Sequence, residues 1–339
     1  MKRAAIAVFV VTLSLCALVP STRAQTGETR TIPLVVMGQD GKIVNDLTAE
    51  NLRVKGTEAR IQNVELDSRP RHVVLLLDIS GSMKSWGVYG GRERWQYAKE
   101  MAKAFLDSAS PRDFLALDEF AKTEAQSVPF THDFTSIRRA IDALPEPGSK
   151  QAVSAWGDET WAGDALHAAL LDIGAEPGFG DTVIFFSDGE FGVDDRRHSP
   201  DLLTAELARR GVRVFLAFAF GSQPVWNTDV PEDMFVFRIS GASMFTENTG
   251  GFSFAPAVFP VFPERSPPLN VYRSDPLQKR MTALSDAVQG TYRVELQLDT
   301  PLRKKHGLQF QVTDHHGKTL YNLLLFYPRN LYPDSVKTP

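Results

Sequence analysis

The residues best suited to chemistry form one short stretch, Asp78-Ile-Ser80-Gly-Ser82, at the end of an apolar run. One carboxylate and two hydroxyls make a hard, oxygen-only donor set, which suits Mg2+ or Mn2+ better than zinc or copper. The apolar run, residues 73–77, is short and bounded by turn residues, which indicates a strand buried on both faces. The three donors would then lie at the carboxyl end of a strand, where open α/β sheets bind their ligands.

Two other points along the chain offer oxygen ligands. Thr160 stands just before an expected helix at 162–174, and Asp188 ends a second apolar run at 182–187. The full set of two carboxylates and three hydroxyls is too small to complete the octahedron that Mg2+ prefers, so waters or an outside carboxylate must supply the rest. A site that is incomplete without an outside ligand is suited to recognition of another molecule.

From residue 71 onward, apolar strands alternate with amphipathic helices, which predicts an α/β fold with a doubly wound, mostly parallel sheet flanked by helices. The expected strands are 72–78, 114–120, 125–130, 182–188 and 212–220, with further strand-like runs at 233–239 and 252–254. The expected helices are 94–109, 136–144, 162–174, 200–210 and 276–287, and residues 149–159 are expected to form a loop.

The two ends of the chain have a different pattern. Residues 25–70 and 289–339 show short alternating apolar runs separated by turn residues, which predicts β-strands. Each segment is too short to hold a core by itself. We therefore expect the two to form one small β side domain, with the α/β unit at 71–288 inserted between them.

Residues 1–24 have the features of a secretory signal peptide: a basic start, an apolar run from Ala4 to Val19 and a small residue, Ala24, at the expected cut. The other interpretation is an uncleaved anchor, although the apolar run is shorter than the ~20 residues of a membrane span. We expect a secreted or periplasmic protein. The single cysteine, Cys16, lies in this segment, so the mature chain would have no disulfide and no cysteine metal ligand.

The charge balance and the absent motifs exclude several classes of function. Loss of the three basic residues of the signal segment takes the formal charge from −4 to −7, which argues against a nucleic-acid partner. No second apolar run approaches membrane-spanning length. The seven histidines show no metal-ligand spacing, and there is no Gly-x-Ser-x-Gly, phosphate-binding loop or His-Glu-x-x-His motif. The sequence does not define an oligomeric state.

The oxygen donors resemble the metal-ion-dependent adhesion site of the von Willebrand factor type A (VWFA) family, written Asp-x-Ser-x-Ser, then a threonine, then an aspartate. The matching residues are Asp78, Ser80, Ser82, Thr160 and Asp188. The order of expected strands and helices also agrees from 73 to 254. The flanks at 41–54, 130–133 and 249–251 resemble a bacterial, acidobacterial-type branch of the family.

This resemblance implies a role for each donor. Ser80, Ser82 and either Thr160 or Asp188 would bind the ion directly, and the remaining one would act through water together with Asp78. The open position would take an acidic side chain of a protein partner. The resemblance therefore implies divalent-metal-dependent protein–protein binding, and not an enzyme.

Other interpretations remain open. One is a metal-assisted hydrolase, for which Glu190 is the candidate general base, and another is an envelope structural component with a stabilising metal site. Asp78 and Ser80 by themselves could also be a turn and helix cap. Asp118 and Glu119 lie within an expected buried strand. A second ion site or polar pair is one interpretation, but we expect the strand to end early, so that both face solvent or a helix N-terminus.

Overall fold

The computed structural model describes residues 27–38, 41–55, 58–84, 86–88, 92–174, 178–189, 191, 199–219, 244–254 and 277–334. Several sequence predictions fall outside these residues. They are the signal segment 1–24 with its cut after Ala24, the strand-like run 233–239 and the candidate base Glu190.

The α/β unit contains the strands that were expected to carry the site. Its strands are β4 (His72–Asp78), β5 (Trp86–Val88), β6 (Arg92–Glu93), β7 (Phe114–Phe120), β8 (Glu124–Thr131), β9 (Thr182–Ser187), β10 (Arg213–Phe218) and β11 (Ser253–Phe254). Its helices are α1 (Arg94–Ser108), α2 (Phe134–Ala143), α3 (Lys150–Trp156), α4 (Ala162–Ile173), α5 (Pro200–Arg210) and α7 (Leu277–Gln289), with a 3-10 turn, η1 (Gly81–Lys84).

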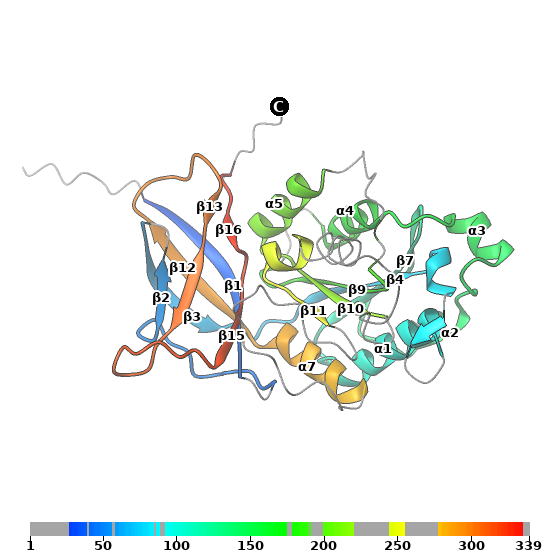
Figure 1. Ribbon diagram of the computed structural model, residues 1–339, viewed down its shortest axis with the longest axis horizontal. Helices are drawn as coiled ribbons and strands as arrows, with labels where there is room; N and C mark the ends of the chain where they lie inside the picture. Colours follow the sequence, from blue (N-terminus) through cyan, green and yellow to red (C-terminus); the bar gives the residue numbers. More distant parts are fainter. Residues whose placement is uncertain are drawn as a thin grey trace, which may run out of the picture.

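The central sheet has the strand order β11-β10-β9-β4-β7-β8 (Figure 1). All its neighbouring strands are parallel except β7 and β8, which pair antiparallel as a hairpin. Apolar residues on one face pack against α1, α2 and α7, and those on the other face pack against α4 and α5. The predicted α/β class with helices on both faces of a mostly parallel sheet is therefore confirmed.

Helix caps explain two differences from the sequence-based expectation. The segment 149–159 was expected to be a loop but contains α3, because the Ser149 hydroxyl accepts the N–H of Ala152 at 3.2 Å and caps the helix. Helix α2 begins two residues earlier than expected. The Asp133 carboxylate accepts the N–H groups of Thr135 and Ser136 at 3.1 and 3.2 Å.

The expectation for Asp118 and Glu119 is wrong. Strand β7 continues to Phe120, because its neighbour β4 pairs with it along its whole length, Leu76 opposite Asp118 and Leu77 opposite Glu119. Both carboxyl groups are buried inside the unit. They face opposite sides of the sheet, so they do not form one ion site.

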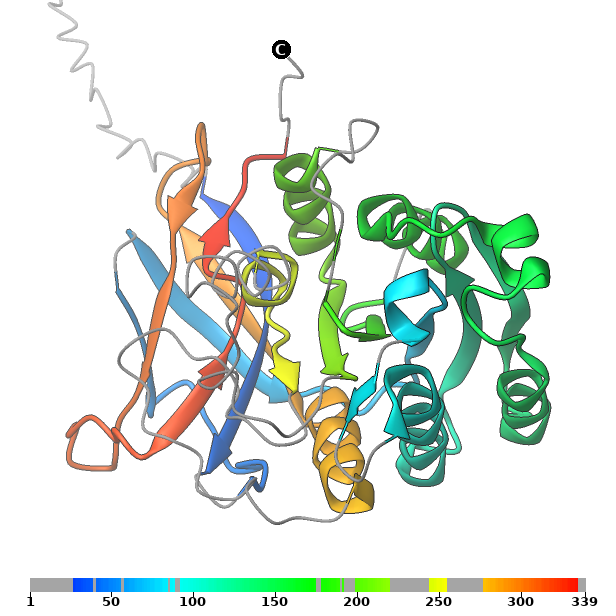
Figure 2. The ribbon, with the colours of Figure 1, turned by 45° about the vertical axis from the view of Figure 1, so that its right-hand side comes forward.

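A second, antiparallel sheet joins the two ends of the chain in the order β15-β1-β12-β3 (Figure 2). This sheet and its short companion strands are β1 (Glu28–Gly38), β2 (Leu52–Lys55), β3 (Ala59–Leu66), β12 (Thr291–Leu298), β13 (His306–Gly307), β14 (Gln309–Val312), β15 (Leu323–Phe326) and β16 (Asn330–Leu331). The terminal segments thus form the common β structure expected from the sequence. The exact domain boundaries at 70/71 and 288/289 stay predictions.

Strand β1 is buried on both faces, which joins the two units. Leu34 and Val36 lie in the core of the β unit. Val35 and Met37 point the other way and belong to the same apolar cluster as the α/β unit. Phe326 of β15 also packs there, with its ring 4.3 Å from that of Phe252.

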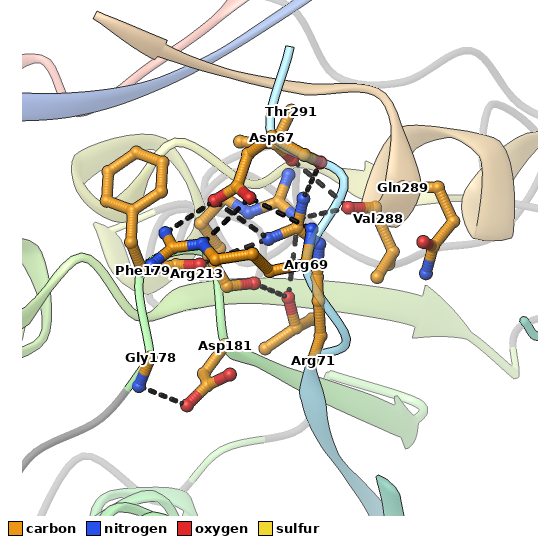
Figure 3. Close-up of polar contacts among 12 residues, drawn as sticks. Asp67, Arg69, Arg71, Gly178, Phe179, Asp181, Arg213, Val288, Gln289 and Thr291 are labelled. Carbon is orange, nitrogen blue, oxygen red and sulfur yellow. Dashed lines mark hydrogen bonds and ion pairs between the residues drawn. The ribbon is translucent and has the colours of Figure 1, made fainter. Parts of the chain in front are cut away.

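A buried polar cluster lies where the two units meet (Figure 3). The Arg71 guanidinium donates to the carbonyl oxygens of Asp67 at 2.8 Å and Phe179 at 3.0 Å. Arg213 donates to the carbonyls of Ala287 and Val288, at the end of α7, at 3.0 and 2.9 Å. The two arginines therefore tie the starts of β4 and β10 to the segments that connect the two units.

A chain truncated to residues 71–287 is expected to aggregate rather than to fold as stably as the full chain. The truncation removes β1 and β15, whose buried Val35, Met37 and Phe326 cover the α/β core, and leaves a large apolar patch exposed. Size-exclusion chromatography and urea unfolding of both chains would check this. A truncated monomer with unchanged stability would contradict it.

Candidate metal site

The candidate site lies where the order in which the chain adds strands to the central sheet reverses. Strands β4 and β9 are neighbours, but the chain leaves β4 toward β7 on its other side and reaches β9 only after α4. Asp78 ends β4 and Asp188 directly follows β9. Such a switch point at the carboxyl ends of parallel strands is the usual ligand-binding position in open α/β sheets.

Asp78 is fully buried and both its carboxyl oxygens are engaged by the chain. Oδ1 accepts the N–H of Ser80 at 2.9 Å, and Oδ2 accepts the hydroxyl of Ser187 at 2.5 Å. Burial raises the pKa of Asp78 to about 7, and the nearby Asp188 carboxylate adds to this effect. These contacts hold the loop after β4 in place.

The hydroxyls of Ser80 and Ser82 share a hydrogen bond, with 3.2 Å between their Oγ atoms. Two neighbouring ligands of Mg2+ at 2.0–2.1 Å would stand about 3 Å apart. The two hydroxyls therefore fit adjacent coordination positions with little movement. Ser82 lies in η1, and Ser80 is buried just before it.

Thr160 is buried in the loop between α3 and α4. Two backbone contacts bring that loop to the carboxyl edge of the sheet: Gly81 N–H donates to the Asp158 carbonyl at 3.3 Å, and Trp161 N–H donates to the Ala121 carbonyl at 2.9 Å. A Cβ on Gly81 would collide with the Asp158 carboxylate. Any larger residue between the two serines would therefore displace the Asp158 carboxylate.

Asp188 forms an ion pair beside the serines. Its buried Oδ2 accepts a hydrogen bond from Arg94 Nη1 at 2.5 Å, and Arg94 is the first residue of α1. Gly189 follows with a φ of +75°, a conformation in which glycine is favoured. The structure therefore brings Asp78, Ser80 and Ser82 to one sheet edge with Asp188, and the loop of Thr160 to the same edge. Their roles as metal ligands stay predictions.

Two residues of this edge were missed by sequence reasoning. Ser187 was assigned only to an apolar strand, although a hydroxyl directly before a strand-ending aspartate was a usable signal. Arg94 was assigned only to the start of a helix. Nothing in the local sequence shows that its guanidinium reaches Asp188, because 94 residues separate the two along the chain.

The described residues contain no metal site built from acidic, histidine or cysteine side chains alone. Within the described ranges, no group of three or more His, Cys, Asp or Glu side chains could hold an ion. The candidate site therefore depends on its hydroxyls. An all-oxygen set with two carboxylates and three hydroxyls fits a hard divalent cation.

Comparison with known proteins identifies the class of the α/β unit. Residues 73–190 match the family model of the von Willebrand factor type A domain, so this part of the chain is a VWFA domain. Domains of this family mediate protein–protein interactions. The acidobacterial-type resemblance of the flanks stays a prediction.

The curated relatives are bacterial. A UPF0353 protein of Mycobacterium tuberculosis is 32% identical over 126 residues, which cover 35% of this chain and 34% of that protein. A UPF0353 protein of Mycobacterium marinum gives the same figures. This chain thus spans about a third of the length of the curated relatives it matches.

Solved structures that are similar to this chain include the following two. The conserved hypothetical protein BatB from Bacteroides thetaiotaomicron has 18% identity and a TM-score of 0.45, covering 65% of this chain and 99% of that one. Proximal thread matrix protein 1 from the mussel byssus, with a zinc-occupied MIDAS motif, has 15% identity and a TM-score of 0.41, covering 72% and 49%. In the part of this chain that the structure describes, no helix is long and apolar enough to cross a membrane.

Proposed function

We propose that this chain is a secreted or periplasmic protein that holds one divalent ion, Mg2+ or Mn2+, and binds an acidic side chain of a protein partner. The observation that carries the proposal is the 3.2 Å separation of the Ser80 and Ser82 hydroxyls, on the same sheet edge as two buried carboxylates. The expected signal segment at 1–24 supports the location.

The site is suited to binding because its residues leave coordination positions of the ion open. Asp78 uses both carboxyl oxygens to hold Ser80 and Ser187, so it positions the loop rather than filling several coordination positions. Two serine hydroxyls, with Thr160 and Asp188, leave room in an octahedron for an outside oxygen. The ion, when bound, supplies a positive charge to which a partner carboxylate can coordinate. We assign the site to recognition and not to catalysis.

Partner capture is expected to require the divalent ion and the site. The full-length mature chain, immobilised and incubated with envelope extract in Mg2+, should retain a partner that EDTA releases. Asp188→Asn and Ser82→Ala should lower capture at least tenfold, because each removes a charge or donor from the ion. Isothermal titration of Mn2+ into the same proteins would show whether the ion itself is lost.

Asp142→Asn is the matched control. Asp142 is an exposed carboxylate of α2 that pairs with Lys103 of α1 at 2.7 Å and is not among the predicted ligands, so capture and Mn2+ binding should stay at the wild-type level. Partner capture that resists EDTA and both site variants would overturn the proposed function. Capture that is lost equally in Asp142→Asn would point to a general effect of charge.

A further inference from the structure

The ion pair at the site is a buried one. Arg94 Nη1 lies 2.5 Å from Asp188 Oδ2, and the two side chains are 12% and 0% exposed. Salt screens a pair of this kind far less than it screens a surface pair. The guanidinium is therefore a fixed positive charge in direct contact with a predicted metal ligand.

The position of Arg94 is otherwise unfavourable for a cation. It is the first residue of α1, a helix of 15 residues with no acidic residue in its first turn, and Glu93 before it makes no side-chain cap. The positive end of the helix dipole disfavours an arginine there. The carboxylate of Asp188 compensates the guanidinium at this helix end.

We propose that Arg94 is a built-in competitor of the divalent ion, holding Asp188 until the ion and an anionic partner bind together. This inference rests on the proposed function and adds a regulatory residue to the same site. The guanidinium and the ion both attract the Asp188 carboxylate, so each weakens the hold of the other. Arg94 thereby lowers the affinity for the ion alone.

The charges of the site explain why a partner would relieve this competition. Arg94 and a divalent ion would both lie beside the Asp188 carboxylate, and their positive charges repel each other. An outside carboxylate that coordinates the ion lowers the positive charge that the ion presents to Arg94. Arg94 thus makes ion binding and carboxylate binding mutually dependent, and such coupling is reciprocal.

Arg94→Gln is expected to bind Mn2+ about tenfold or more tightly than wild type in the absence of any partner, because a unit charge a few ångströms from the ion is removed. Titration followed by the electron paramagnetic resonance of free Mn2+ would measure this. Arg138→Gln is the charge-matched control: Arg138 pairs with Asp107 at 2.6 Å on the surface, and its loss should leave Mn2+ affinity unchanged. Arg94→Lys, with its shorter reach, should fall between wild type and Arg94→Gln.

Thermal unfolding gives a second readout. In EDTA, Arg94→Gln should melt below wild type, because Asp188 stays buried without the guanidinium. Saturating Mn2+ should then raise the melting temperature of Arg94→Gln by more than it raises that of wild type, since tighter binding to the folded chain stabilises it further. Arg138→Gln should show the wild-type shift.

The outcomes separate this inference from the proposed function. If wild type binds Mn2+ and Arg94→Gln binds it equally or more weakly, the inference that Arg94 competes with the ion is wrong. The proposed function would still stand. Mn2+ binding by neither protein would overturn both. Tight binding by Arg94→Gln with little or none by wild type would support the inference in its strongest form. If Arg94→Gln does not fold, the Mn2+ affinity of Arg94→Lys decides instead. A higher affinity than wild type supports the competition, and an equal or lower affinity overturns it.

Discussion

Arg71→Met is expected to lower the free energy of unfolding by about 3–5 kcal/mol, the usual cost of removing one partner from a buried ion pair. Arg71 and Asp67 have side chains that are 0% and 2% exposed, with 3.6 Å between Nη1 and Oδ2. Methionine would fill part of the space but could not donate to the carbonyls of Asp67 and Phe179. Those oxygens would be left buried and unsatisfied.

Arg69→Met provides the matched control because Arg69 contacts the same carboxylate. Its nitrogens lie 3.0 and 2.7 Å from the two carboxyl oxygens of Asp67, but its side chain is 53% exposed. Water can replace the lost contact, so the expected loss is about 1 kcal/mol or less. Urea unfolding of the two variants under identical conditions measures the difference.

The same two variants should keep the metal site intact. Arg71 precedes β4 and Asp78 ends it, which puts the two about 20 Å apart along the strand. Mn2+ affinity should therefore be unchanged at temperatures where Arg71→Met is folded. Equal destabilisation by both substitutions, or a loss of Mn2+ binding in Arg71→Met, would show that the cluster in Figure 3 is not the specific junction described here.

The elements that position the site could be predicted from the sequence because local signals determine them. A run of apolar residues that stops at Asp78 or Asp188 indicates both the strand and its end, and the sheet topology then brings such ends together. The loop after β4 needs no distant information either: Asp78 accepts the N–H of Ser80, only two residues later. Short-range spacing was therefore enough to indicate Asp78, Ser80 and Ser82 as one group of donors.

The contacts that modify the site could not be predicted in this way. The Arg94–Asp188 pair and the Ser187–Asp78 hydrogen bond join residues from different elements, and a residue type does not reveal a partner that is about a hundred positions away. The expectation for Glu119 was wrong for another reason. A carboxylate in an apolar strand was expected to end the strand, but pairing with β4 and β8 kept it inside.

The two buried carboxyl groups of β7 should make the fold less stable as the pH rises. Burial raises the pKa of Asp118 to about 8, with a further contribution from the nearby Asp172 carboxyl, and burial raises the pKa of Glu119 to about 7. In the unfolded chain both groups lose their protons near pH 4. Between about pH 4 and 8 the folded chain therefore binds more protons than the unfolded one, and its stability falls with rising pH.

Asp118→Asn should remove the part of this dependence that Asp118 contributes, while Glu119 and Asp78, whose pKa values are also raised to about 7, keep theirs. Near pH 4 the wild-type carboxyl is protonated in the folded chain and still about half protonated in the unfolded one, so the amide of similar shape should change the free energy of unfolding little. At pH 8 the variant should be more stable than wild type by about 2 kcal/mol or more, since each pH unit across the interval contributes up to about 1.4 kcal/mol per group. Urea unfolding at pH 4.5, 6 and 8 would measure both limits.

Asp142→Asn tests whether the effect belongs to burial and not to the loss of a carboxylate as such. The bond from Lys103 lowers the pKa of the exposed Asp142, so this group stays ionised in both states above pH 5 and contributes no slope there. Its variant should follow the wild-type pH profile over that range. A parallel shift of the Asp118→Asn profile, with the wild-type slope retained, would mean that Asp118 titrates normally despite its burial. A flatter pH dependence of the free energy of unfolding in Asp118→Asn would instead show that the ionised carboxylate of Asp118 destabilises the folded chain.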